Sequence, residues 1–288
     1  LKVGMFNARM WNNPFCFETE GNRLEVQSAY DIGYLLCGPM ISDFVFWMDC
    51  LTTQQNIKNI WLCARDGYLL QEMYKGLFTN KKVTYFLTSR TAAIRAGMET
   101  EEDILYVDGM KFFGTPKESL RVRFGLEPER EKKEVVDGGL LQYKELILEK
   151  SKCQKQYYKE YICGLHPEEG EIAVFDFVAK GTTQMYLQRL VDCHLKGLYF
   201  LQLEPEFMKD KGLDIVPFYT EEEKNESSIF EYYYILETIL TAPHPSISEF
   251  SEGGTPVYAK ETRNEKDIQC FGEAQRGIKD YFEKYLMI

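Results

Sequence analysis

Four short apolar runs provide the framework that this sequence predicts. They cover residues 60–64, 83–88, 172–177 and 197–202, and polar residues bound each of them. A helical pattern of apolar residues follows each of the first three runs. Buried strands that alternate with helices are typical of a mostly parallel sheet covered on both faces. The expected fold class is therefore α/β, a Rossmann-like three-layer domain with a mostly parallel sheet.

Helical patterns account for much of the remaining chain. From about residue 26 to residue 55 apolar residues recur at helical spacing, and the interruption at Gly38-Pro39 predicts two helices or one kinked helix. Residues 100–165 carry no strand pattern, and two of their predicted helices begin near a capping box. We therefore expect one α/β domain over residues 1–288, with a helical insertion or cap at 100–165. Residues 1–24 are expected to be irregular.

Composition excludes several classes of protein. The chain has 34 basic and 45 acidic residues, a net charge of −11, which argues against a nucleic-acid or anionic-membrane surface. The eight cysteines form no CxxC pair, so buried thiols in a reducing cytoplasm fit better than a disulfide framework or a zinc site. No apolar run reaches the length of a membrane span. The expectation is a cytoplasmic protein without a membrane span. Five cysteines lie in apolar periodic segments: Cys37, Cys50, Cys63, Cys163 and Cys193.

Charged and small residues stand where three of the apolar runs end. Ligands of open parallel sheets bind outside the carboxyl ends of the strands, so these residues are the candidate site. We expect Asp66 and Asp176 to be catalytic, as acid/base groups or as ligands of a phosphate-bound metal, with Mg²⁺ the candidate cofactor. Because burying an unpaired carboxylate is costly, Asp66 should be held by one of the cations at this edge or by amides of a neighbouring turn. The residues expected to bind ligand or phosphate are Arg65, Gly67, Ser89, Arg90, Lys180, Gly181, Thr182, Thr183 and Gln184.

Phosphate is the anion that this pattern favours. The helices predicted behind the turns leave free amide donors at their starts, and three cations lie at the same edge of an otherwise acidic chain. Arginine can bind phosphate through two parallel hydrogen bonds. For each motif taken alone, a structural role at the sheet edge or in a helix cap remains the alternative. The three motifs together favour a ligand site.

Several known signatures are absent from the sequence. It contains no GxGxxG, GxxxxGK[ST], GxSxG or HExxH motif, and no Asp-x-Asp pair of the kind that aspartyl-nucleophile phosphatases need. Among the three histidines, His244 in the loop "TAPHPSISEF" is the candidate to test, because this proline-rich loop could fold over the sheet edge.

The segments "IWLCARDGYLL", "YFLTSRTA", "FDFVAKGTTQ" and "ETILTAPHPSISEF" together resemble a known family. They are similar to the C-terminal region of bacterial predicted HAD-superfamily hydrolases, which are associated with glycosyltransferases of surface polysaccharide biosynthesis. The resemblance spans about residues 30–250. In that family the aspartyl-nucleophile motif lies upstream of these segments, and this chain has no counterpart of it.

The resemblance implies a domain that binds a phosphorylated sugar or a nucleotide-sugar, with phosphoryl or glycosyl transfer or hydrolysis as the candidate reactions. A glycosyltransferase would be its partner or a fused domain. Two alternatives stay open: a binding module that serves the transferase without catalysis, and a scaffold whose charged sheet edge is only structural.

Overall fold

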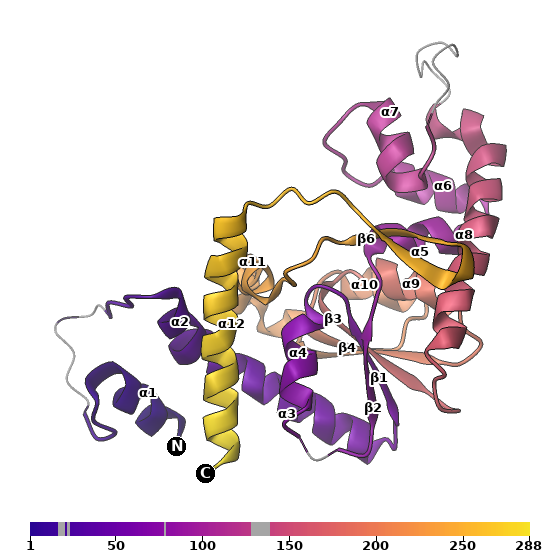
Figure 1. Cartoon of the computed structure of the whole chain (residues 1–288). Helices are drawn as coiled ribbons and strands as arrows, with labels where there is room; N and C mark the ends of the chain where they lie inside the picture. The colour runs from indigo at the N-terminus through magenta and orange to yellow at the C-terminus, as the bar shows by residue number, and fades with distance from the viewer. Residues whose placement is uncertain (17–20, 22–23, 78, 128–138) are drawn as a thin grey trace.

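The centre of the protein is a five-stranded sheet in which all strands run parallel (Figure 1). This computed structural model describes residues 1–16, 21, 24–77, 79–127 and 139–288. The expected α/β class with a parallel sheet is confirmed. In spatial order the strands are β2 (Lys82–Phe86), β1 (Asn59–Cys63), β3 (Ile172–Ala179), β4 (Leu195–Gln202) and β5 (Ile215–Tyr219).

Alternate side chains of the strands enter two separate cores, because successive strand residues point to opposite faces. On one face Leu62, Phe175 and Phe200 pack under helices. On the other face Trp61 stacks on Phe86 with the ring centroids 4.2 Å apart. The helices over the first face are α3 (Gly38–Gln54), α4 (Gly67–Tyr74), α11 (Ile229–Leu240) and α12 (Glu265–Leu286). Those over the second face are α5 (Arg90–Gly97), α8 (Lys144–Gly164) and α9 (Thr182–Gln188).

The N-terminal segment differs from the expectation in one way. Helix α1 (Lys2–Trp11) forms where an irregular stretch was expected. The predicted kinked helix is one helical stretch, Ala29–Gln54, made of α2 (Ala29–Asp31), the π-helix η1 (Ile32–Cys37) and α3. Proline has no amide hydrogen to donate, and the wider π-turns directly precede Gly38-Pro39.

The same stretch corrects the expectation that no apolar run is long enough to span a membrane. Its 26 residues are long and apolar enough to cross one by length and composition. Half of its most apolar 18-residue segment is buried inside the fold, and Phe44 and Met48 are fully inaccessible to solvent. A core helix of a globular domain passes the same test, so this finding does not place the protein in a membrane.

The expected helical insertion is present in the described part of residues 100–165, which contributes no strand to the sheet. Both predicted capping boxes form, one between Thr100 and Asp103 and one between Thr115 and Glu118. Residues 128–138 of this prediction lie outside the described residues. The elements are α6 (Glu101–Asp108), α7 (Pro116–Ser119), the π-helix η2 (Leu120–Phe124), the 3-10 helix η3 (Gly139–Tyr143) and α8, on the second face of the sheet (Figure 1).

The segment after β4 contains two strands that the sequence pattern did not predict, β5 and β6 (Ile247–Ser251). Strand β5, at the edge of the sheet, carries Pro217, which breaks the usual strand pattern and is tolerated at an edge. Strands β6 and β7 (Thr255–Tyr258) form an antiparallel hairpin against α8, where the Gln154 amide bonds both backbone groups of Phe250. The short helices α10 (Pro205–Asp210), η4 (Glu221–Asn225) and η5 (Glu252–Gly254) complete the chain.

The cysteine prediction is only partly correct. All eight cysteines are free thiols. Cys37 and Cys63 are buried as expected, but Cys50 and Cys163 are exposed and Cys193 is half-buried. A position in an apolar periodic segment therefore did not decide whether a cysteine side chain is buried or exposed.

Candidate functional site

A polar cavity of about 340 Å³ lies at the carboxyl ends of the central strands. Strands β1, β2 and β3 are parallel neighbours, so the expectation that their ends share one edge is confirmed. The loops after these strands line the cavity together with the start of α9, helix α11 and the residue before β6. The charged lining residues are Arg65, Asp66, Arg90, Asp176 and Glu237, and the hydroxyl-bearing ones are Thr88, Ser89, Thr91, Thr183 and Ser246.

Half of the residues predicted for the site reach this cavity. Those that line it are Arg65, Asp66, Ser89, Arg90, Asp176 and Thr183. Those outside its lining are Gly67, Lys180, Gly181, Thr182, Gln184 and His244. Glu237 lines the cavity but was not predicted. A signal for it exists in the sequence, because Glu237 lies at helical spacing from Tyr233 and Leu240 on the otherwise apolar side of its helix.

Three carboxyl groups gather at the cavity, and each has a raised pKa. Burial is the main cause for all three. The neighbouring charges of Asp176 and Glu237 raise the pKa of Asp66 further, well above its usual range. The pKa of Asp176 rises to about 6, with Arg90 and the amide of Phe177 acting in the opposite direction. With a pKa of about 6, Asp176 can exchange a proton near neutral pH, which is the property a general acid or base requires.

The expectation that Asp66 would be held by a cation or by turn amides is wrong for the described part of the chain. Its carboxylate makes no hydrogen bond or ion pair with a described residue, although the charge of Arg65 lowers its pKa to some extent. Arg65 instead directs its guanidinium to the hydroxyls of Thr241, at 3.0 and 3.2 Å, and Ser246, at 3.2 Å. Asp66 is thus a cavity-lining carboxylate without a fixed partner among the described residues.

Arg65 also makes the turn after β1. Its φ of +76° lies in the left-handed region that usually requires glycine. Its backbone amide donates to the Tyr85 hydroxyl at 2.9 Å, which holds this conformation. Gly67 serves a different purpose from the one expected. A Cβ there would approach the Leu62 backbone carbon to 2.8 Å, so this glycine permits close packing of α4 on β1 rather than close approach of a ligand.

His244 lies next to the site rather than in it. Its Nδ1 is 2.8 Å from the carbonyl oxygen of Pro245, which can only accept, so Nδ1 carries the hydrogen. Its Nε2 is then the acceptor for the Tyr85 hydroxyl at 2.7 Å. Arg65, Tyr85 and His244 therefore form one chain of hydrogen bonds that fixes the proline-rich loop against the β1 turn. The prediction that this loop folds over the sheet edge is confirmed.

Arg90 provides the positive charge that is available to a ligand. It is exposed at the start of α5, lines the cavity, and makes no hydrogen bond or ion pair with a described residue. Its charge lowers the pKa of both Asp176 and Glu237, which places it close to both carboxylates.

The turn after β3 departs most from the prediction. The strand continues to Ala179, beyond the expected end at residue 177, and carries Lys180 past the cavity. Lys180 is exposed and pairs with Glu204 beyond the end of β4. Gly181 does make the expected tight turn, with a φ of +84°. Lys180 is therefore not a phosphate ligand in this geometry.

The remaining predicted polar residues have structural partners. The Ser89 hydroxyl donates to the carbonyl of Ile247 at 2.6 Å and accepts from the Ala92 amide, so it caps α5 and ties the hairpin to it. The buried Gln184 amide donates to the carbonyls of Leu195 and Asp214, each at 3.0 Å. Thr182 shares a hydrogen bond with Tyr106 at 3.1 Å.

Carboxylate oxygens at the cavity are the donors that Mg²⁺ prefers, and this ion usually keeps several of its waters. Asp66, Asp176 and Glu237 do not meet closely enough to ligate one ion together. One or two of them could hold a hydrated ion that also binds a phosphate.

The described residues contain one cluster with metal-ligand spacing, formed by Glu171, His194 and Asp214. It lies where β3, β4 and β5 begin. His194 is exposed, and Lys196 already pairs with Asp214 at 3.0 Å.

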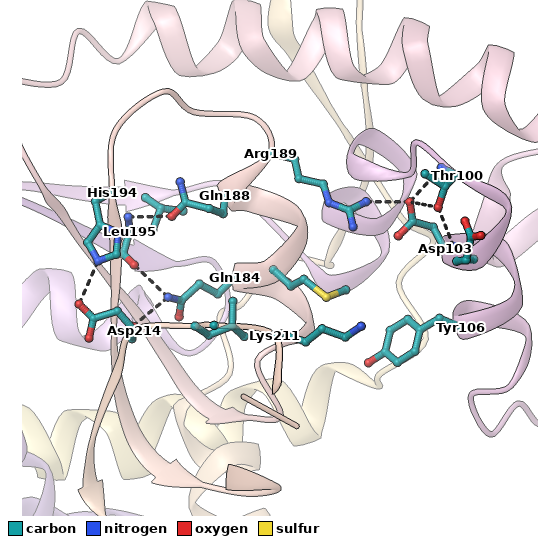
Figure 2. Close-up of a pocket in the computed structure, with 14 residues that line it drawn as sticks. Thr100, Asp103, Tyr106, Gln184, Gln188, Arg189, His194, Leu195, Lys211 and Asp214 are labelled. Atoms are coloured by element: carbon teal, nitrogen blue, oxygen red, sulfur yellow. Dashed lines mark hydrogen bonds and ion pairs between the residues drawn. The ribbon is translucent and has the colours of Figure 1, made fainter. Parts of the chain in front are cut away.

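A larger cavity of about 510 Å³ lies beside that cluster, away from the carboxyl ends of the strands. Figure 2 shows two pairs among its charged groups, Arg189 with Asp103 at 2.7 Å and His194 with Asp214 at 2.9 Å, whereas Lys211 has no interaction drawn. Its two glutamines bond backbone carbonyls. The smaller cavity is the better candidate because it lies at the carboxyl ends of the strands and because none of its charged residues makes an ion pair with a described residue.

Comparison with known proteins does not identify the chain. No protein-family model matches it, and a search of curated proteins finds no related sequence. The functional assignment therefore depends on the chemistry of the cavity.

Proposed function

We propose that the protein binds a phosphorylated sugar or a nucleotide-sugar in the cavity at the strand ends. The observation that carries the proposal concerns the charged groups of this cavity. The Arg90 guanidinium lines it together with three carboxyl groups, and none of the four has a side-chain partner among the described residues. The guanidinium suits the phosphate. The carboxylates suit sugar hydroxyls or a phosphate-bound Mg²⁺.

The wider role comes from the sequence resemblance to HAD-type hydrolase-associated proteins. It supports a role in bacterial surface polysaccharide synthesis beside a glycosyltransferase. If the domain is catalytic, Asp66 and Asp176 are the acid/base candidates: the pKa of Asp176, about 6, suits proton exchange near neutral pH, and burial raises the pKa of Asp66 so that it favours the protonated acid. The second candidate function is ligand binding without turnover. It is favoured by the absence of an Asp-x-Asp pair from the chain, which leaves no recognisable aspartyl nucleophile.

A thermal-shift screen of sugar phosphates and nucleotide-sugars, with and without Mg²⁺, tests the binding. A ligand at a hundredfold over its Kd should stabilise the protein by about 2.7 kcal/mol. Product analysis of the ligands that bind then separates turnover from binding.

Two matched variants locate the site. Arg90→Gln should weaken binding of a phosphorylated ligand by roughly tenfold or more, because a charge-assisted hydrogen bond contributes about 1.5–3 kcal/mol. Lys180 lies at the same sheet edge but pairs with Glu204 outside the cavity. The Lys180→Gln variant should therefore bind ligands like the unmodified protein. Equal losses in both variants, or no binding of any compound, would refute the proposal.

A further inference from the structure

Helix α11 contributes one carboxylate to a face that otherwise buries apolar side chains. Leu236 and Leu240 on this side are 3% and 0% exposed, whereas Tyr234 and Ile235 on the outer side are about half exposed at 54% and 47%. Glu237 is half-buried between these two sides and lines the cavity. Packing alone does not explain a glutamate here, because burying a carboxylate is costly.

Glu237 lies within the field of both cavity arginines without pairing to either. Arg65 and Arg90 both lower its pKa, whereas only Arg65 acts in this way on Asp66 and only Arg90 on Asp176. Among the described residues its carboxylate has no hydrogen bond or ion pair. Glu237 is therefore the one of the three carboxylates whose pKa responds to both guanidinium charges, and all of these groups line the same cavity.

The chemistry of a carboxylate restricts what can fill this position. An ionised carboxylate only accepts hydrogen bonds, and it repels a phosphate. When Glu237 is ionised, the ligand group nearest to it must therefore donate hydrogen bonds, while the ligand's phosphate lies toward Arg90. A sugar that carries a phosphate meets both requirements, and inorganic phosphate meets only one.

We infer that Glu237 is the specificity-determining residue of this site and accepts hydrogen bonds from the hydroxyl groups of the sugar. The inference rests on the proposed function. Asp176 is less suited to this task because one of its oxygens already accepts from the Phe177 amide at 3.0 Å. Glu237 selects sugar phosphates over free phosphate, and Arg90 supplies the affinity for phosphate that both share.

Calorimetric titrations with glucose 1-phosphate, galactose 1-phosphate, UDP-glucose and inorganic phosphate test the inference on the full chain. Glu237→Gln should lose roughly tenfold to a hundredfold in affinity for a sugar ligand that binds the unmodified protein, because a charged hydrogen-bond acceptor is removed. Its affinity for inorganic phosphate should stay the same or rise. Glu231→Gln, an exposed position on the same helix, is the control and should bind every probe as before.

The outcomes separate the inference from the proposed function. If none of the four probes binds the unmodified protein, the proposed function fails and the inference fails with it. If a sugar ligand binds but Glu237→Gln lowers its affinity and that of phosphate equally, or changes neither, only the inference is overturned. Glu237→Asp, which keeps the charge and shortens the reach, covers the case in which the glutamine variant does not fold. It should lose sugar affinity selectively as well, and unchanged binding would count against the inference.

Discussion

Replacing Asp176 by asparagine should stabilise the protein at neutral pH. The pKa of this carboxyl rises from its ordinary value of 3.8 to about 6 because the end of β3 is buried. At about 1.4 kcal/mol for each pH unit, the rise corresponds to roughly 3 kcal/mol. This figure is an upper limit, because the side chain reaches the cavity surface, where solvent screens part of the effect.

The sign follows from proton linkage. A raised pKa means that the folded state favours the protonated carboxyl. That stabilisation is fully present below pH 3.8 and is lost as the pH rises through about 6. Asparagine resembles the protonated acid and can still accept from the Phe177 amide, so the advantage of Asp176→Asn should be small near pH 4 and should grow to about 1–3 kcal/mol by neutral pH.

Urea unfolding followed by tryptophan fluorescence between about pH 4 and pH 8 measures this difference. Asp192→Asn, at an exposed position in the loop before β4, is the matched control and should show no comparable pH-dependent gain. If Asp176→Asn is less stable than the unmodified protein near neutral pH, Asp176 has a stabilising charge partner and the reasoning is wrong. A difference that is the same at all pH values would also refute it.

Two further predictions concern the turn after β1. Gly67→Ala should lower the free energy of unfolding by about 1–3 kcal/mol, because the new Cβ would meet strand backbone at 2.8 Å. Gly272→Ala, in open space on α12, is the control and should be neutral or stabilising. Urea unfolding compares the two variants. Tyr85→Phe should cost about 1–3 kcal/mol, because it leaves the half-buried Arg65 amide without its acceptor; an unchanged midpoint would show that water replaces the hydroxyl. Tyr68→Phe, whose ring packs edge-on against Tyr85, is the control for loss of a hydroxyl alone and should be near neutral.

The part of this fold that could be predicted from the sequence is the part whose residues follow a regular period. Buried parallel strands such as residues 60–64 read as continuous apolar runs, and the strand-turn-helix order places their ends on one edge. Strand β5 was not predicted because Pro217 interrupts its otherwise apolar and aromatic run, Ile215–Tyr219.

The site was harder to predict because side-chain direction depends on where each strand stops. Strand β3 runs two residues further than its apolar run suggests, which moves Lys180 from the expected site to a pair with Glu204. Asp66 was expected to pair with a cation, but Arg65 bonds to hydroxyls that are distant in the sequence, on the segment before β6. Glu237 comes from a helix about sixty residues after the last predicted strand-end motif, and only tertiary contact brings it to the cavity.

The charge balance of the cavity links its three carboxylates to its ligand. With Asp66, Asp176 and Glu237 ionised, the two guanidinium groups leave one net negative charge. A phosphate dianion would bring two more into a partly buried space, where like charges repel more strongly than in water. Two remedies are physically available: the carboxylates can take up protons, as their raised pKa values favour, or Mg²⁺ can enter with the phosphate. Binding of a phosphorylated ligand at this edge must therefore be coupled to a proton or to a metal ion. For this reason the comparison with and without Mg²⁺ bears directly on how the site works.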